Sequence, residues 1–217
     1  MPEFETMITV ALAGLALSAT PGPSMLYVLS RSVGQSRAAG FASAIGLGLG
    51  GVLLAIATAF GLSIVFATFE WVVPALRLIG SLYLVWLGVD LIREAYRTSD
   101  DEMRTRAVRH RSFGSIIWQG VWIELLNPKT VLFFALFLPP FVETGTTGGR
   151  EGPVWLQFLV LGALVPITAV PSDLAVAWMG GTAAERLTRS RNVRIGLAWT
   201  GGLILIGIAG NLHLGLI

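Results

Sequence analysis

The sequence predicts an all-α integral membrane protein whose six transmembrane helices form a 3+3 inverted repeat. Three observations support this: the apolar composition, the number of long apolar segments, and two proline-containing breaks at corresponding places in the two halves. Of 217 residues, 54% are hydrophobic and only 13% are charged, and the mean hydropathy is +0.73. A soluble domain carries roughly 25% charged residues, so this composition is typical of a chain that lies in lipid.

Six apolar segments are each near or beyond the ~20 residues that a helix needs to cross a hydrocarbon core of ~30 Å. We place the spans at 7–29, 41–67, 72–94, 113–139, 154–180 and 195–216. The polar segment before the first span has no basic residue, so it is unlike the start of a cleaved signal peptide. Only short connectors separate the spans. We therefore expect residues 1–217 to form a single transmembrane domain.

The first and fourth spans are predicted to be broken by prolines. Thr20-Pro21-Gly22-Pro23 lies within the first span, and Asn127-Pro128-Lys129 lies near the middle of the fourth. Each proline removes a backbone donor, and its ring clashes with the preceding turn. Either motif alone could be a structural kink, because Gly and Pro are common in membrane helices.

The positions of the two breaks favour a functional role. Each broken span opens a half of three spans, and an odd number of crossings makes the second half enter the membrane from the opposite side. Pro21 and Pro128 are 107 residues apart. Broken helices at corresponding places of an inverted repeat are typical of secondary transporters, which bind substrate between discontinuous helices at the midplane.

Three ionisable residues lie within the predicted spans. Glu124 and Lys129 belong to the fourth and Asp173 to the fifth. Such groups cost at least ~2.5 kcal/mol each on insertion scales, so they face a cavity or a partner. A structural ion pair with Lys129 and a substrate site are both open. Pro166 and Pro171 are expected to weaken the fifth span before Asp173, and we infer a wet cavity between spans one, four and five.

Small residues four apart recur in the first two spans and allow helices to approach closely in lipid. They are Gly14, Ser18 and Gly22 in the first span, and Ala42, Gly46 and Gly50 in the second. A packing seam inside one bundle is the expected role. A homodimer contact is the alternative.

The distribution of basic residues predicts the orientation. Twelve arginines flank the connectors after spans one, three and five, whereas the other side has only Arg150. Because positively charged loops stay in the cytoplasm, we expect both termini outside the cytoplasm of a multi-pass protein of the cell (inner or plasma) membrane. These dispersed arginines form no continuous basic face, so no nucleic-acid partner is expected.

Several chemistries have no support in the residues. The chain has no cysteine and only two histidines, His110 and His213, so we expect no metal site. It has no Gly-rich ATP loop, no Gly-x-Ser-x-Gly elbow and no His-Glu-x-x-His motif. We therefore expect neither a cofactor nor an enzymatic activity.

Four sequence blocks resemble the LysE/RhtB-type amino-acid exporters. They are Ala-Thr-Pro-Gly-Pro at 19–23, Gln-Ser-Arg-Ala-Ala-Gly at 35–40 leading into Gly46, Gly-Ser-Leu-Tyr-Leu-Val-Trp-Leu-Gly at 80–88, and Leu-Asn-Pro-Lys at 126–129. The resemblance implies a six-span inner-membrane bundle that exports an amino acid or similar small metabolite by exchange with protons. Glu124 departs from the neutral polar residue expected there, which leaves room for a cationic substrate.

We therefore predict a secondary transporter that holds a small-molecule amino-acid substrate within the lipid bilayer. The candidate substrate-binding or gating residues are Thr20, Pro21, Gly22, Pro23, Glu124, Asn127, Pro128, Lys129 and Asp173. The helix N-termini after the breaks, with Lys129, would bind the substrate carboxylate. Glu124 and Asp173 would bind the ammonium, and one of them would carry the proton. An exporter of an inorganic cation or other small solute on the same architecture, and a non-transporting scaffold, are the alternatives.

Overall fold

The computed structural model describes residues 2–19, 22–68, 71–97, 109–142, 153–179 and 190–214, and the regular structure in these ranges is entirely helical. In chain order the elements are α1 (Phe4–Ala19), α2 (Pro23–Gly34), α3 (Arg37–Thr68), α4 (Val72–Arg97), α5 (Phe113–Leu125), α6 (Pro128–Leu132), the π-helical turn η1 (Phe133–Phe137), the 3₁₀ turn η2 (Pro139–Phe141), α7 (Val154–Met179) and α9 (Arg191–Leu214).

Both predicted breaks are present. The axes of α1 and α2 differ by 53°, and those of α5 and the segment Pro128–Phe141 differ by 49°. Within the described residues, three helices are long and apolar enough to cross a membrane, or up to five if each bent pair is one span. The three are α3, α7 and α9. The sixth crossing, which would be α4, stays a prediction.

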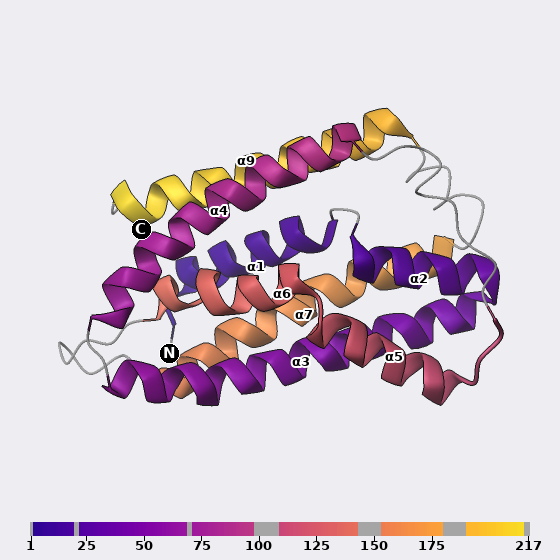
Figure 1. Ribbon diagram of the computed structural model, residues 1–217, viewed down its shortest axis with the longest axis horizontal. Helices are drawn as coiled ribbons and strands as arrows, with labels where there is room; N and C mark the ends of the chain where they lie inside the picture. The colour runs from indigo at the N-terminus through magenta and orange to yellow at the C-terminus, as the bar shows by residue number, and fades with distance from the viewer. Residues whose placement is uncertain are drawn as a thin grey trace.

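The helices run lengthwise between two ends of the bundle, as Figure 1 shows. The chain reverses direction between successive spans. The N-terminal end of α1 and the C-terminal end of α9 therefore lie at the same end of the bundle. At the opposite end lie the C-terminal end of α2, the N-terminal end of α3, the C-terminal end of α4 and the N-terminal end of α9. These helix ends carry Arg31, Arg37, Arg97 and Arg191.

The fifth predicted span differs from expectation. The weakening expected around Pro166 and Pro171 is wrong, because α7 is one continuous helix through both prolines. A proline removes a single backbone hydrogen bond from an otherwise complete ladder. Packing supports the helix at this point, since a Cβ on Gly51 of α3 would lie only 3.0 Å from Cβ of Pro166.

Glycines set the distance between the helices. Gly46 of α3 crosses α5 so closely that a Cβ there would overlap the backbone carbonyl oxygen of Ile117, and a Cβ on Gly120 would lie 3.0 Å from Cα of Gly46. The stripe predicted in the second span is therefore a seam inside the bundle. Helices α4 and α9 cross in the same way at Gly88 and Gly202. A Cβ added to either glycine would lie 2.6 Å from the carbonyl oxygen of the other. The predicted homodimer contact stays a prediction.

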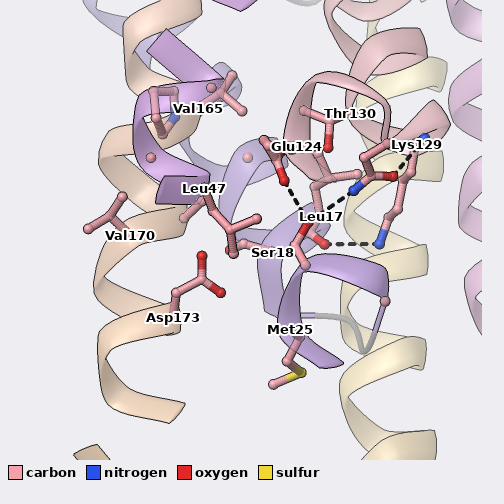
Figure 2. A pocket seen from close by; sticks show the side chains of 18 of the residues that line it. Leu17, Ser18, Met25, Leu47, Glu124, Lys129, Thr130, Val165, Val170 and Asp173 are labelled. Carbon is pink, nitrogen blue, oxygen red and sulfur yellow. Dashed lines mark hydrogen bonds between the residues drawn. The ribbon is translucent and has the colours of Figure 1, made fainter. Parts of the chain in front are cut away.

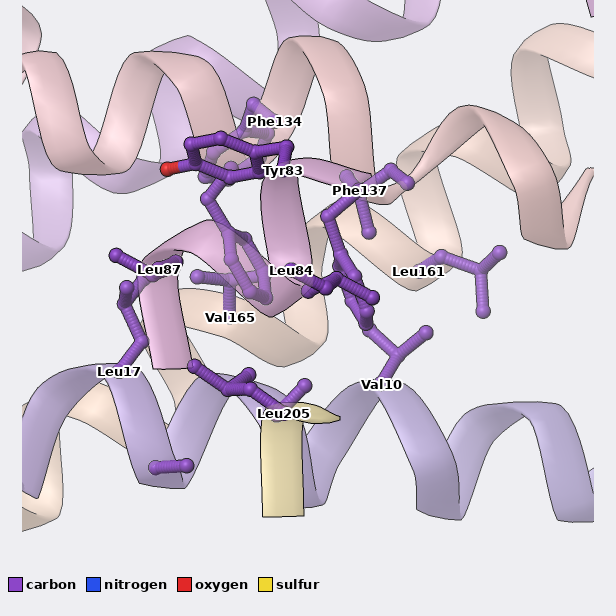
Figure 3. Packing of buried hydrophobic residues seen from close by; sticks show 14 of the residues in the cluster. Val10, Leu17, Tyr83, Leu84, Leu87, Phe134, Phe137, Leu161, Val165 and Leu205 are labelled. Atoms are coloured by element: carbon purple, nitrogen blue, oxygen red, sulfur yellow. The ribbon is translucent and has the colours of Figure 1, made fainter. Parts of the chain in front are cut away.

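An aromatic core fixes the second half of the fourth span. Phe133, Phe134 and Phe137 of η1 are buried and pack with Tyr83 and Leu84 of α4, as Figure 3 shows. The rings of Phe133 and Phe137 stack with centroids 4.2 Å apart. In lipid such packing, and not exclusion from water, stabilises the bundle. The core holds this half-helix against α4, away from the half that precedes the break.

Polar contacts hold α2 against α5 at the arginine-bearing end. The buried guanidinium of Arg31 donates to Oε1 of Gln119 (2.8 Å) and to the carbonyl of Arg109 (3.0 Å). Tyr27 donates from its hydroxyl to the carbonyl of Ile116 at 2.7 Å. Ser32 joins α2 to α7 through the carbonyl of Ala177, at 2.8 Å. The half-helices α2 and α5 are therefore fixed to one another, and α2 is also fixed to α7.

Candidate functional site

A pocket lies where the two broken helices meet, against α3 and α7 (Figure 2). Its cavity volume is about 50 Å³, and the empty space grows to about 630 Å³ when the open mouth is included. Because one water needs about 10–15 Å³ of cavity volume, the pocket holds a few waters or a compact solute. Six of the predicted site residues line it, namely Gly22, Pro23, Glu124, Asn127, Lys129 and Asp173.

Of the remaining three predicted residues, the structure describes Pro128 alone, and it does not line the pocket. Pro128 is the first residue of α6 and lies beside it, with its side chain exposed. Thr20 and Pro21 lie outside the described residues, so the expectations placed on them stay predictions.

The first break presents the N-terminus of α2 to the pocket. Gly22 is the N-cap and Pro23 is the first helical residue, a position where its missing N–H costs nothing. The first backbone bond back into the helix start runs from Leu26 to Gly22, at 2.9 Å. The N–H groups of Ser24 and Met25 precede it and have no acceptor within the helix. This N-terminus can therefore bind an anionic group.

At the second break, Asn127 caps α6 and also reaches the first break. Its Oδ1 accepts from the backbone N–H of Lys129 at 3.1 Å, which is an N-cap hydrogen bond. Its Nδ2 donates to Oγ of Ser24 at 3.1 Å. One buried side chain thus joins the starts of both second half-helices.

Glu124 ends this chain of hydrogen bonds. Ser24 donates from its hydroxyl to Oε2 of Glu124 at 2.6 Å, and Thr130 donates to Oε1 at 2.9 Å. Bonds of this kind to an ionised carboxylate are short and strong. Both carboxylate oxygens therefore act as acceptors, one for a hydroxyl that follows the first break and one for a hydroxyl that follows the second.

Lys129 connects the second break to the end of α1. Its Nζ donates to the carbonyl oxygen of Leu17 at 3.0 Å. Leu17 lies in the last turn of α1, where carbonyls lack partners within the helix and where the helix dipole favours a cation. Lys129 therefore contacts the first half of the first span, while its ammonium also lines the pocket.

Asp173 faces the pocket from α7, on the side away from Glu124, Thr130 and Lys129 (Figure 2). It is 6% exposed, and it makes no hydrogen bond or ion pair with the part of the chain that the structure describes. Its charge interacts with that of Glu124. The pocket therefore places two acidic groups and one basic group around a single small volume.

Sequence reasoning missed Ser24 and Thr130. Each lies in the first turn of the helix that follows a break, which is the signal that could have identified them. Their partner Glu124 was predicted from its charge alone. Within the described ranges, no group of three or more His, Cys, Asp or Glu side chains is placed to hold a metal ion.

Known proteins with similar sequences are membrane translocators. The LysE type translocator family matches residues 15–215. The chain is 26% identical over 200 residues to a leucine efflux protein of Salmonella typhimurium, covering 89% of this chain and 90% of that one. It is 26% identical over 184 residues to a homoserine/homoserine lactone efflux protein of the same organism, covering 85% and 82%.

A third relative is a threonine efflux protein of Salmonella typhimurium, 25% identical over 171 residues, with 79% of this chain and 82% of that one covered. No solved structure matches. Because the family match spans nearly all of the chain, from the first half-helix through α9, this protein belongs to the LysE type translocator family, whose members are transporters and not enzymes.

Proposed function

We propose that this protein is a secondary transporter that exports an amino acid across the inner membrane in exchange for protons. The observation that carries the proposal is the meeting of both broken helices at one pocket with two carboxyl groups and one ammonium. The names of the relatives, which are efflux proteins for leucine, homoserine and threonine, support the substrate class and the direction.

An amino acid fits the distribution of charge around the pocket. Its carboxylate would bind at the N-terminus of α2, where the N–H groups of Ser24 and Met25 and the helix dipole favour an anion. The ammonium of Lys129 would assist from the pocket wall. The substrate ammonium would bind at one of the two carboxyls, Glu124 or Asp173, and the other would carry the exchanged proton. The start of α2 lies beside Glu124, because the hydroxyl of Ser24 contacts that carboxyl at 2.6 Å.

The same proposal includes the membrane arrangement. Six crossings in a 3+3 inverted repeat, within a single domain of residues 1–217, would place both termini outside the cytoplasm. The common position of the α1 start and the α9 end supports this, as does the arginine-bearing opposite end. An outward-facing arginine end would contradict the positive-inside rule.

The test is transport by purified protein in lipid vesicles. Radiolabelled leucine, threonine, homoserine and lysine would be offered under an imposed pH gradient, with protein-free vesicles as the control. We expect at least one to accumulate with the gradient and to lose accumulation when an ionophore removes it. Gradient-dependent movement of an inorganic cation alone, with no amino-acid flux, would instead support the cation exporter.

A further inference from the structure

We propose that the two pocket carboxyls have separate roles: Glu124 is the permanently ionised group that binds the substrate ammonium, and Asp173 is the group that carries the exchanged proton. This inference rests on the proposed function, which leaves the two roles unassigned. It is drawn from the hydrogen bonds that reach one carboxyl and not the other.

The direction of the hydrogen bonds that run from Asn127 through Ser24 to Glu124 is determined by a backbone group. Oδ1 of Asn127 accepts from the N–H of Lys129 at 3.1 Å, and a backbone N–H can only donate. The amide must therefore point its Nδ2 at Ser24. Ser24 has one hydroxyl proton, and because its oxygen already accepts from Asn127, the proton is available for Oε2 of Glu124 at 2.6 Å.

The second oxygen of Glu124 is also an acceptor. Thr130 is buried and donates to Oε1 at 2.9 Å. A protonated carboxyl would carry a donor on one oxygen, so either Ser24 or Thr130 would lose its acceptor. Leaving a buried donor unsatisfied is costly. The arrangement of donors therefore matches the ionised form of Glu124.

Asp173 has the opposite surroundings. Asp173 is only 6% exposed, and no hydrogen bond to its carboxyl comes from the described residues. A buried charge without donors is expensive, and a bound proton removes that cost. The other titratable groups of the described pocket wall are Glu124 and Lys129, while α1, α2 and α3 contribute none.

This difference couples the two ligands. In the empty pocket a proton on Asp173 removes the repulsion from the ionised Glu124 nearby. A substrate ammonium that binds at Glu124 supplies positive charge to the same space, so Asp173 can release its proton. Proton and ammonium thus replace one another beside a fixed carboxylate, and no further charged group is required.

The test compares two transport modes in vesicles, with the probe that wild-type protein carries fastest among labelled leucine, threonine, homoserine and lysine. Proton-driven accumulation requires a titrating group, whereas exchange of internal for external substrate requires only binding and movement of the site. Asp173→Asn should lose accumulation at least about tenfold and keep exchange. Glu124→Gln should raise the half-saturating concentration for exchange about tenfold or more, since a hydrogen-bonded charge is removed.

Substitutions of Ser24, which donates to Glu124, test the same assignment without a change in either carboxyl. Ser24→Ala should raise the half-saturating concentration for exchange, Ser24→Thr should restore it, and in a Glu124→Gln background Ser24→Ala should have no further effect. Ser30→Ala is the matched control on α2, because its hydroxyl bonds only its own helix at Tyr27. Ser172→Ala is the control on α7, bonded to the carbonyl of Ala169.

Several results would overturn the assignment. Retained accumulation by Asp173→Asn would do so, as would loss of exchange by that variant with its folded fraction unchanged. Normal half-saturation in Glu124→Gln combined with lost accumulation would reverse the two roles. Absence of flux in the wild-type protein, in contrast, would refute the proposed function itself, so the two failures are distinguishable.

Discussion

Replacing Gly50 by Ala should damage both stability and transport, because this glycine lies directly against Glu124. A Cβ at position 50 of α3 would lie 2.7 Å from Cβ of Glu124 and 2.9 Å from the carbonyl oxygen of Val121. Ordinary contact begins at about 3.4 Å, so the added carbon is about 0.7 Å and 0.5 Å too close. The Val121 oxygen belongs to the backbone of α5 and cannot turn away, so α3 and α5 must separate.

The magnitude follows from two effects. Overpacking a close helix crossing costs typically about 1–3 kcal/mol. A displacement of about 0.7 Å would also lengthen the 2.6 Å bond between Ser24 and Glu124 beyond the roughly 2.5–3.0 Å that O–H···O bonds span, and a hydrogen bond to a charged group contributes about 1.5–3 kcal/mol. We expect the free energy of unfolding to fall by about 2.5–6 kcal/mol and amino-acid flux to fall about tenfold.

The measurement is the free energy of unfolding in mixed detergent micelles, together with flux in vesicles normalised to folded protein. Gly61→Ala is the matched control, since it makes the same change on the same helix at a position with nothing within 4 Å. Gly61→Ala should be neutral or slightly stabilising, because Ala is the better helix former. If Gly50→Ala equals Gly61→Ala in both assays, the contact with Glu124 does not position the carboxylate as argued here.

Three further predictions concern other parts of the chain. The protein has no cysteine, so a single cysteine can be placed at the exposed Ser36 or Glu3. Glu3→Cys should react with an impermeant maleimide from outside the cell, and Ser36→Cys from inside only. Labelling of Ser36→Cys in intact cells would show that the orientation is the reverse. Replacing Pro21 and Pro23 together by Ala should permit a continuous helix and abolish flux with insertion intact, and normal flux would reduce the motif to a kink. Lys129→Met should insert but not transport, because its Nζ no longer holds the end of α1 at Leu17; recovery of flux in a double variant with Glu124→Gln or Asp173→Asn would reveal a structural ion pair instead.

The breaks could be predicted from the sequence because the chemistry of proline is local. Pro23 and Pro128 each occupy the first position of a helix that follows a sharp bend. The expected weakening of the fifth span was wrong because the same chemistry can be overridden by packing: Pro166 lies inside a continuous helix against Gly51. A proline thus marks a possible break, and the neighbouring helices decide whether it forms.

The position of the charged residues on the pocket wall was also predictable, since an ionisable group in a membrane span is costly unless it faces a cavity or a partner. Ser24 and Thr130 were not, because hydroxyls are common in membrane helices and their role depends on a partner. That partner is Glu124, which is 100 residues from Ser24 in the chain. The π-helical turn at Phe133–Phe137 was likewise not expected, because no local residue pattern distinguishes it from an ordinary apolar helix.

The contact between Gly50 and Glu124 also has an evolutionary consequence. Any side chain at position 124 needs the space that glycine leaves at position 50, and an acidic one also needs the hydroxyl donors at positions 24 and 130. An ancestor with a neutral residue at 124 could acquire the carboxylate without loss of stability only if both donors were already present. Loss of the carboxylate would in turn leave these two donors without their acceptor, which is also costly. Substitutions at positions 24, 124 and 130 are therefore coupled in both directions, whereas Gly50 is needed whichever side chain stands at position 124.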